Sequence, residues 1–440
     1  MTTLLTTELS ELDKKHFIHP TSSIAQQQAE GPSHIFTEGK GVYLTDTNGH
    51  KVIDGMSSLW NVNIGHGVKE MAEAAYEQMS KLAFTSNFST FSNEPAIRLA
   101  EKLSKILPGD LNAVFFTSGG SESNDTAFKL ARHYWILKDQ PERQKIISRK
   151  MSYHGVAMGA TSATGLKPFR DFTNANAPHF HYVNSSVEEF RTLVEKEGPE
   201  TIAAFIAEIV QGAGGVNLPP EGYFKEIRKI CDEYGILMII DEVITGFGRT
   251  GKYFAIEHEE IQPDMLCFAK GVTSGYAQLG GVALNDRLHN DFKTLSKGTL
   301  LHGYTYSGHP VACNVALKNI EIIERNGLIE NAKKMGEELY KGLKYLEEKH
   351  AIVTNARGFG LLGGIDIVKD SQSGERFAEY LSPLIVKEAA KLGLILRTVT
   401  YDHDSIVFSP PLIINKAEVE QMVNILDQAI SNVKREVLKG

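Results

Sequence analysis

Two glycines and a serine follow a predicted strand and could hold an anion. Gly119, Gly120 and Ser121 lie between the apolar stretch 112–116 and a stretch whose apolar residues recur at helical spacing. Backbone N–H groups at such a turn point outward at the positive end of the helix, and the Ser121 hydroxyl adds a donor, which suits a phosphate. The alternative is a tight turn with a capping side chain, because glycine-rich turns between a strand and a helix are common.

A carboxylate and a lysine follow two other predicted strands. Asp241 comes directly after the apolar run 236–240, and Lys270 comes shortly after the run 265–268. A carboxylate that leaves a buried strand needs a positive partner or several donors, and a protonated pyridine nitrogen would be such a partner. A lysine desolvated at such a place loses proton affinity and becomes a nucleophile. Taken alone, each residue would more often be a solvated surface group.

The three features together match the parts of one cofactor. The anion cradle, the carboxylate of Asp241 and the amine of Lys270 can serve the phosphate, the ring nitrogen and the aldehyde of pyridoxal phosphate. A nucleotide-binding domain that uses only the Gly119-Gly120 turn is a rival hypothesis, but it gives Lys270 no role. The combination therefore favours pyridoxal phosphate.

The elements that must bring these residues together alternate along the chain. Short apolar strands are predicted at 112–116, 145–148, 202–207, 236–240 and 265–268. An amphipathic helix is predicted at 223–234, with Gly235 as its left-handed stop. Alternating strands and helices predict an α/β fold with a mostly parallel sheet flanked by helices, in which ligands collect at the carboxyl ends of the strands.

The length of the chain predicts two domains. At 440 residues it is too long for one compact core. We expect a large cofactor-binding domain over 66–325 and a smaller α+β domain formed by 1–65 and 326–440. Asn415 and Glu418 are spaced as a capping box, so the last helix is predicted to begin there.

Composition and charge narrow the class of protein. The net charge of −8 excludes the basic footprint of a nucleic-acid partner. No apolar run is long enough for a membrane span, and the polar, acidic start of the chain lacks the pattern of a secretory signal. The cysteines Cys231, Cys267 and Cys313 show no close pairing and no metal-ligand spacing, so we expect buried thiols, no metal and a cytoplasmic location.

Longer motifs resemble those of the class III aminotransferases of the fold-type I pyridoxal-phosphate superfamily, in the ω-amino acid or amine:pyruvate group. The similarity runs from 41–44 to 409–412, and it is most specific in 241–251, 268–271 and 302–310. It implies the fold-type I architecture. It also implies an enzyme that moves the amino group of a primary amine to a keto acid by a ping-pong mechanism.

The resemblance also implies residue roles. Lys270 would be the Schiff-base lysine, and Asp241 would pair with the pyridinium nitrogen. The implied cofactor-binding residues are Gly119, Gly120, Ser121, Tyr153, Val243, Tyr304 and Thr305. Tyr153 and Val243 would cover the two faces of the ring. Tyr304 and Thr305 would reach the phosphate of the neighbouring subunit's cofactor in an obligate homodimer with shared active sites, with a tetramer left open. From the residues alone, Tyr153 could be a loop aromatic that covers the core, and Thr305 a plain loop hydroxyl.

Five positions bear on the substrate. Trp60, Phe88 and Arg397 match substrate-binding positions of the amine:pyruvate group, and a guanidinium fork suits the carboxylate of a small keto acid. Core packing of the two aromatics and a solvated arginine are the alternatives. Ala213 and Ile244 replace a glutamate and a glutamine of many relatives that use 2-oxoglutarate. Pyruvate is therefore the expected acceptor, whereas β-alanine, taurine and diamines all fit as donors.

Some alternatives and departures from the family pattern stay open. The rival enzymes are a 2-oxoglutarate-dependent diamine or ornithine-type aminotransferase and diaminopelargonate synthase, and the non-enzyme alternative is a cofactor-binding regulatory module. Gly119 stands where the family has Asn or Ser, and Ser123 where it has Ala. Ile209 replaces the proline of a Glu-Pro pair, from which we expect only a small backbone effect. We expect Arg249 to serve loop structure, where it can pair with a carboxylate.

Overall fold

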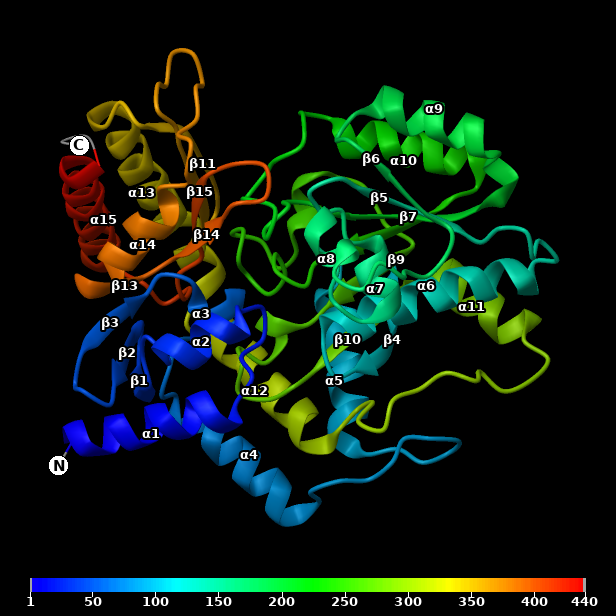
Figure 1. The fold of residues 1–440 in the computed structure, drawn as a ribbon. Helices are drawn as coiled ribbons and strands as arrows, with labels where there is room; N and C mark the ends of the chain where they lie inside the picture. The colour runs from blue at the N-terminus through cyan, green and yellow to red at the C-terminus, as the bar shows by residue number, and fades with distance from the viewer. Residues whose placement is uncertain (1, 438–440) are drawn as a thin grey trace.

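A seven-stranded sheet forms the centre of the molecule (Figure 1). The structure is a computed structural model that describes residues 2–437. Its strands, in the spatial order β4-β10-β9-β8-β7-β5-β6, span Leu111–Thr117 (β4), Gly280–Asn285 (β10), Met265–Phe268 (β9), Leu237–Asp241 (β8), Ile202–Glu208 (β7), Lys145–Arg149 (β5) and Phe180–Val183 (β6). Neighbours are parallel except at β10, which runs antiparallel to both β4 and β9. The predicted mostly parallel sheet is confirmed.

The central strands are buried on both faces, which explains their continuous apolar sequence. Successive side chains of a strand point to opposite faces, so Ile240 packs in one hydrophobic core and Ile239 in the other. Helix α6 (Gly120–Leu137) covers the face of Ile239, and α10 (Tyr223–Tyr234) packs in the core of Ile240. The predicted end of α10 is confirmed, because Gly235 has φ 68° and its N–H donates to the carbonyl of Cys231.

Further helices surround this sheet or extend from it. They are α4 (Lys69–Lys81), α5 (Glu94–Ile106), α7 (Met158–Ala163), α8 (Lys167–Asp171), α9 (Val187–Glu197), α11 (Asp286–Leu295) and α12 (Pro310–Arg325). In Figure 1, α4 lies at the edge of the molecule opposite to α9 and α10.

Two four-stranded sheets lie beside the central sheet. One has the order β1-β2-β3-β13 and the other β11-β12-β15-β14. Their strands span Phe36–Lys40 (β1), Tyr43–Asp46 (β2), Lys51–Asp54 (β3), Leu394–Ile395 (β13), Val353–Phe359 (β11), Leu362–Ile367 (β12), Ser405–Phe408 (β15) and Arg397–Val399 (β14). Strand β13 pairs in parallel with β3, so a late segment of the chain completes a sheet that an early segment begins. The domain limits at 65 and 326 remain a prediction.

The remaining helices flank these two sheets (Figure 1). They are α1 (Thr2–His16), α2 (Ile24–Glu30), α3 (Ser57–Trp60), α13 (Leu328–Lys349), α14 (Ser382–Lys391) and α15 (Lys416–Val437). The predicted capping box before α15 is confirmed, since Glu418 N–H donates to Asn415 Oδ1 and Asn415 N–H donates to Glu418 Oε2, both at 3.0 Å.

Two sequence expectations about surface and core can also be compared with the structure. Cys231, Cys267 and Cys313 are free, buried thiols, as expected. Within residues 2–437, no helix combines the length and the apolar character that crossing a membrane requires.

Candidate active site

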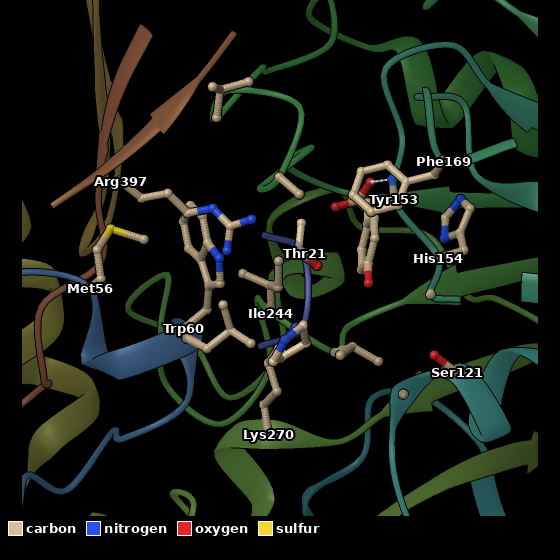
Figure 2. A pocket seen from close by; sticks show the side chains of 18 of the residues that line it. Thr21, Met56, Trp60, Ser121, Tyr153, His154, Phe169, Ile244, Lys270 and Arg397 are labelled. Carbon is tan, nitrogen blue, oxygen red and sulfur yellow. Dashed lines mark hydrogen bonds between the residues drawn. The ribbon is translucent and has the colours of Figure 1, made fainter. Parts of the chain in front are cut away.

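One cavity of about 780 Å³ collects most of the predicted site residues. It lies between the central sheet and the strand that carries Arg397 (Figure 2). The predicted residues that line it are Lys270, Asp241, Gly120, Ser121, Tyr153, Val243, Trp60 and Arg397. They come from segments far apart in the sequence, so the fold brings together the amine, the carboxylate and the glycine turn as the sequence predicts.

Four predicted residues do not line this cavity in the single chain. Gly119 precedes α6, and its carbonyl accepts the N–H of Ser123. Phe88 is 51% exposed and lies against Gly303, whose added Cβ would be 3.0 Å from the phenyl ring. Tyr304 turns its hydroxyl toward the carbonyl of Glu122 at 3.3 Å, and Thr305 is exposed. The predicted action of Tyr304 and Thr305 in a neighbouring subunit stays a prediction, as do the cofactor role of Gly119 and the substrate role of Phe88.

Asp241 ends β8 and is held by three neighbours. Asn124 Nδ2 donates to Asp241 Oδ2 at 2.8 Å, the Val243 N–H donates to Oδ1 at 3.0 Å, and His154 Nδ1 lies 2.8 Å from Oδ2. The sequence analysis missed Asn124 and His154, although His154 directly follows Tyr153 and Asn124 lies one helical turn after Gly120.

Lys270 follows β9 and has a strained backbone. Its φ of 43° lies in the left-handed region, which residues other than glycine rarely adopt and which is often found at functional sites. Burial lowers the pKa of its amine to about 8, and the charges of Asp241 and Glu208 oppose this shift. A larger fraction of the Lys270 amine is therefore neutral near neutral pH than for an exposed lysine.

Glu208 is a site residue that the sequence analysis missed. It ends β7, pairs in register with Asp241 on β8, and lines the cavity. Its carboxylate accepts the N–H of Tyr153 at 2.9 Å and the N–H of Gly212 at 3.1 Å. Burial raises the pKa of Glu208 to about 7, the charge of His154 opposes this shift, and the charge of Asp241 adds to it. A carboxylate at the end of an apolar strand was the available signal, as it was for Asp241.

The glycine turn packs directly against Val243. A Cβ on Gly120 would lie 2.8 Å from Val243 Cγ1, so any side chain there would fill the space between the two residues. A Cβ on Gly155, which has φ 123°, would collide with the Ser121 hydroxyl. Ser121 Oγ accepts the N–H of Val156 at 3.1 Å, which leaves its O–H free to donate into the cavity.

These observations fit pyridoxal phosphate. The cavity offers donors at the start of a helix for a phosphate, the aromatic side chain of Tyr153 for a ring, a buried carboxylate for a pyridine nitrogen and an amine of lowered pKa. The residues present therefore match the parts of this cofactor.

Arg249 belongs to the scaffold of the cavity and does not line it. It is fully buried, and its guanidinium donates to Ser57 Oγ at 3.1 Å, to Asn63 Oδ1 at 2.8 Å and to the carbonyl of Pro410. Burial lowers the pKa of Arg249 to about 9, and the charge of Asp54 opposes this shift. The expected direct pairing with a carboxylate was wrong for the described residues, because the guanidinium bonds neutral oxygens.

The opposite wall of the cavity carries the predicted substrate residue Arg397. Arg397 starts β14, and among residues 2–437 no hydrogen bond or ion pair occupies its guanidinium. Ala213 and Ile244 also line the cavity. The sequence analysis missed several further lining residues, which are Met56, Ser58, Leu59, Phe169 and Tyr401. Tyr153 and Phe169 contact each other edge to face, with ring centroids 5.3 Å apart (Figure 2).

A possible metal site lies elsewhere. In the described part of the chain, His34, Asp46 and His50 are the residues whose ligand atoms all lie within 4.8 Å of one another. None of the three lines the cavity.

Comparisons with known proteins agree with this geometry. Residues 24–430 match the family model described as Aminotransferase class-III. A putrescine–pyruvate aminotransferase from Pseudomonas aeruginosa is 36% identical over 459 aligned residues, which cover 100% of this chain and 99% of the relative. A solved transaminase from the marine bacterium Virgibacillus is 53% identical, with a TM-score of 0.96 over 98% of this chain and 100% of its own. A solved (S)-enantioselective omega-transaminase from Thermomicrobium roseum is 44% identical, with a TM-score of 0.94 over 97% and 98%.

Proposed function

The chain belongs to the class-III aminotransferase family, and from this premise we propose that it transfers the amino group of a primary amine or ω-amino acid to pyruvate. Enzymes of this family depend on pyridoxal phosphate. The observation that carries the proposal is the convergence of Lys270, Asp241 and the Gly120 turn on one cavity that also contains Arg397.

Each part of the cofactor has a residue to hold it. Lys270 would hold the aldehyde carbon, Asp241 would pair with the ring nitrogen, and Ser121 with the backbone at Gly120 would bind the phosphate. Tyr153 lies across the cavity from Lys270 and contributes an aromatic face (Figure 2). When bound, pyridoxal phosphate carries the amino group between the two substrates and takes up the electron pair of the broken C–H bond.

Asp241 and Lys270 are the residues proposed to hold or transfer protons during the reaction. Asp241 is held by three neighbours that bond or face its carboxylate, and this carboxylate would keep a proton on the ring nitrogen. Lys270 has an amine of pKa about 8, so it can take a proton from the substrate carbon and return it at the end of the transfer. The first substrate leaves as an aldehyde or ketone before the keto acid enters, so ping-pong kinetics are expected.

The support for pyruvate comes from three lining residues. Ala213 and Ile244 contribute a methyl group and an aliphatic side chain where a glutamate or glutamine would add polar atoms. Residue 213 therefore offers no carboxylate that could pair with the Arg397 guanidinium. The guanidinium can then pair with the carboxylate of the substrate. The name of the relative from Pseudomonas aeruginosa, which uses pyruvate, supports the same acceptor.

A screen of amine donors against two acceptors tests the proposal. β-Alanine, taurine and putrescine are each mixed with pyruvate or 2-oxoglutarate, and alanine or glutamate formation is measured. We expect alanine from at least one donor and little glutamate. Glutamate as the main product would replace the proposal with a 2-oxoglutarate-dependent enzyme, and no product from any pair would contradict it.

The Lys270→Ala variant tests the assignment of the lysine. It should lose the visible absorbance band of the cofactor–lysine bond and about a thousandfold or more of the turnover, because it lacks both the covalent anchor and the general base. Substantial remaining transamination would contradict the role of Lys270.

We also propose a homodimer whose interface contains the exposed apolar residues near Phe88. Phe88 is 51%, Tyr306 57% and Leu301 89% exposed. Phe84 joins this surface, because its ring meets that of Tyr306 edge to face at 6.0 Å. Solvent-exposed apolar groups gathered in this way mark a protein interface. Burial of this surface against a second copy would bring Phe88 and the neighbouring Thr305 toward the partner's cavity.

We further propose that the enzyme acts in the cytoplasm. The three buried free thiols support this location, since such cysteines suit a reducing compartment.

A further inference from the structure

A buried aspartate lies behind the loop that carries Trp60. Asp54 ends β3, and its side chain is fully buried. Its carboxylate accepts the N–H of Met56 at 3.2 Å, the N–H of Ser58 at 2.7 Å and the Ser58 hydroxyl at 3.2 Å. His66 Nε2 lies 2.8 Å from the same carboxylate. The sequence analysis assigned no role to Asp54.

The loop that Asp54 holds has an unusual backbone. Ser57, Ser58 and Trp60 have φ angles of 46°, 57° and 60°. Residues with a Cβ rarely adopt such angles, and they persist only where the surrounding structure enforces them. Ser57 is held separately, since its hydroxyl donates to the carbonyl of Ser409 at 2.7 Å and accepts from Arg249 Nη2 at 3.1 Å.

This strained loop forms a wall of the cavity. Met56, Ser58, Leu59 and Trp60 all line it, whereas Asp54 itself does not. The hydrogen bonds from Met56 and Ser58 to the carboxylate therefore connect a buried charge to the surface that a substrate meets.

The wall with Arg397 is joined to the same strand. In the parallel pairing of β3 with β13, Asp54 stands opposite Ile395, and the N–H of Gly55 donates to the carbonyl of Ile395 at 3.0 Å. Arg397 follows two residues later at the start of β14. Two walls of the cavity thus meet at the end of β3.

We propose that Asp54 is a positioning residue that fixes the shape of the substrate cavity by holding the 56–60 loop in its strained conformation. Through this loop Asp54 sets which amines bind productively, while it touches neither substrate nor cofactor. The inference rests on the proposed function, because it requires that this cavity binds the amine. Loss of the Asp54 charge relaxes the loop and moves Trp60.

A second buried aspartate offers a matched control. Asp46 is 6% exposed, ends the neighbouring strand β2 of the same sheet, and accepts the N–H groups of Asn48 and His50, each at 2.9 Å. His34 Nδ1 lies 3.0 Å from it, as His66 does for Asp54. Asp46 and its partners do not line the cavity. Asp46→Asn therefore removes a similar charge from a similar turn without disturbing the 56–60 loop.

The test compares Asp54→Asn with Asp46→Asn in the holoenzyme. For Asp54→Asn we expect the KM of the amine donor to rise about tenfold with a smaller change in kcat, because the wall of the cavity is displaced. Hydrogen exchange of residues 55–61 should accelerate, while the visible absorbance of the bound cofactor stays at the wild-type level. Asp46→Asn should lower the melting temperature by a similar amount but leave the KM and the exchange of 55–61 unchanged.

A double variant tests the role of strain directly. Glycine adopts the φ of residue 58 without strain, so the loop can keep its shape without Asp54. Ser58→Gly combined with Asp54→Asn should therefore have a KM close to that of the wild-type enzyme. If Asp54→Asn does not fold, Ser57→Ala serves instead. It removes the hydroxyl that bonds Ser409 and Arg249, and it should raise the KM and the exchange of 55–61 in the same way.

Several outcomes would overturn the inference. The first is an unchanged KM in Asp54→Asn, or in Ser57→Ala if Asp54→Asn does not fold. The second is an equal rise in KM in Asp46→Asn. The third is a double variant whose KM is as high as that of Asp54→Asn. These results differ from failure of the proposed function, in which the wild-type enzyme itself would transfer no amino group to either keto acid.

Discussion

His154 Nδ1 and Asp241 Oδ2 lie 2.8 Å apart in the interior, where the two residues are 2% and 4% exposed. The imidazole therefore faces the carboxylate that we propose as the partner of the cofactor's ring nitrogen. His154→Ala should weaken pyridoxal phosphate binding and lower kcat, each about tenfold, because the variant removes one partner that holds the Asp241 carboxylate in place. Titration of the apoenzyme with cofactor, followed by visible absorbance, measures this. Asn124→Ala, which removes another partner of Asp241, should act in the same direction, and unchanged binding in both variants would contradict the role of the cluster.

Gly120→Ala should reduce cofactor affinity about tenfold or more, because the new methyl group would lie 2.8 Å from Val243 Cγ1 and displace the side chain that is proposed to cover one face of the ring. The double variant with Val243→Ala should regain part of the loss. Gly119→Ala provides the comparison, since a Cβ at Gly119 meets nothing within 4 Å and should cost less affinity. Equal losses at Gly119 and Gly120 would show that the turn itself, and not the space beside Val243, determines binding. Equilibrium dialysis with pyridoxal phosphate distinguishes these results.

Arg397→Ala should lower kcat/KM about a hundredfold for pyruvate and β-alanine, which carry a carboxylate, because a charge-assisted pair is lost. An uncharged alkylamine donor should lose much less in the amine half-reaction. Single-turnover reactions with each substrate separate the two half-reactions. A similar loss for all three substrates would remove Arg397 from the carboxylate site.

Uptake of pyridoxal phosphate by the apoenzyme should accelerate from pH 6 to pH 8. The pKa of Lys270 is lowered to about 8, so below this pH the amine is protonated and cannot bond the aldehyde, and each unit of pH reduces the neutral fraction about tenfold. Glu208, with a pKa of about 7, changes charge in the same interval. Glu208→Gln removes that second ionisation and should leave the dependence on Lys270. Stopped-flow absorbance gives the rates, and equal rates at pH 6 and pH 8 would contradict the lowered pKa.

Leu301→Glu should disrupt the proposed dimer. Analytical ultracentrifugation of the wild-type protein should give about twice the chain mass of 48.6 kDa. In the variant we expect the monomer and weaker cofactor binding, because a charge is placed in the apolar surface near Phe88. Phe172→Glu is the matched control, since Phe172 and Leu301 are both 89% exposed. Dissociation by Phe172→Glu alone would place the interface elsewhere.

The sequence predicted the elements whose chemistry is continuous along the chain. Strands β7 and β8 were predicted because burial on both faces gives a continuous apolar run. Helix α10 was predicted because burial of one helical face gives apolar residues at helical spacing. β10 was not predicted. Its first two residues are glycines, which favour no strand, and Gly281 is required because a Cβ there would lie 2.5 Å from the ring of Phe268.

The residues of the candidate site, like the strands, could be predicted only where a local sequence pattern surrounds them. Lys270 and Asp241 could be found because each follows an apolar strand, and a family motif surrounds each of them. His154 and Glu208 belong to the candidate site because they bond to residues that are distant in sequence. The local spacing of residues does not predict such bonds. Asp54 is a further example, because its importance lies in the backbone angles of the loop that follows it.

The pairing of β3 with β13 also constrains how the protein is made. Strand β3, which ends at Asp54, is translated long before β13, which contains its pairing partner Ile395. Until then the nascent chain presents β3 as an open edge, which is a template for unwanted association. The wall that carries Arg397 is therefore translated after the 56–60 loop, and the cavity is complete only once β13 and β14 have been synthesised.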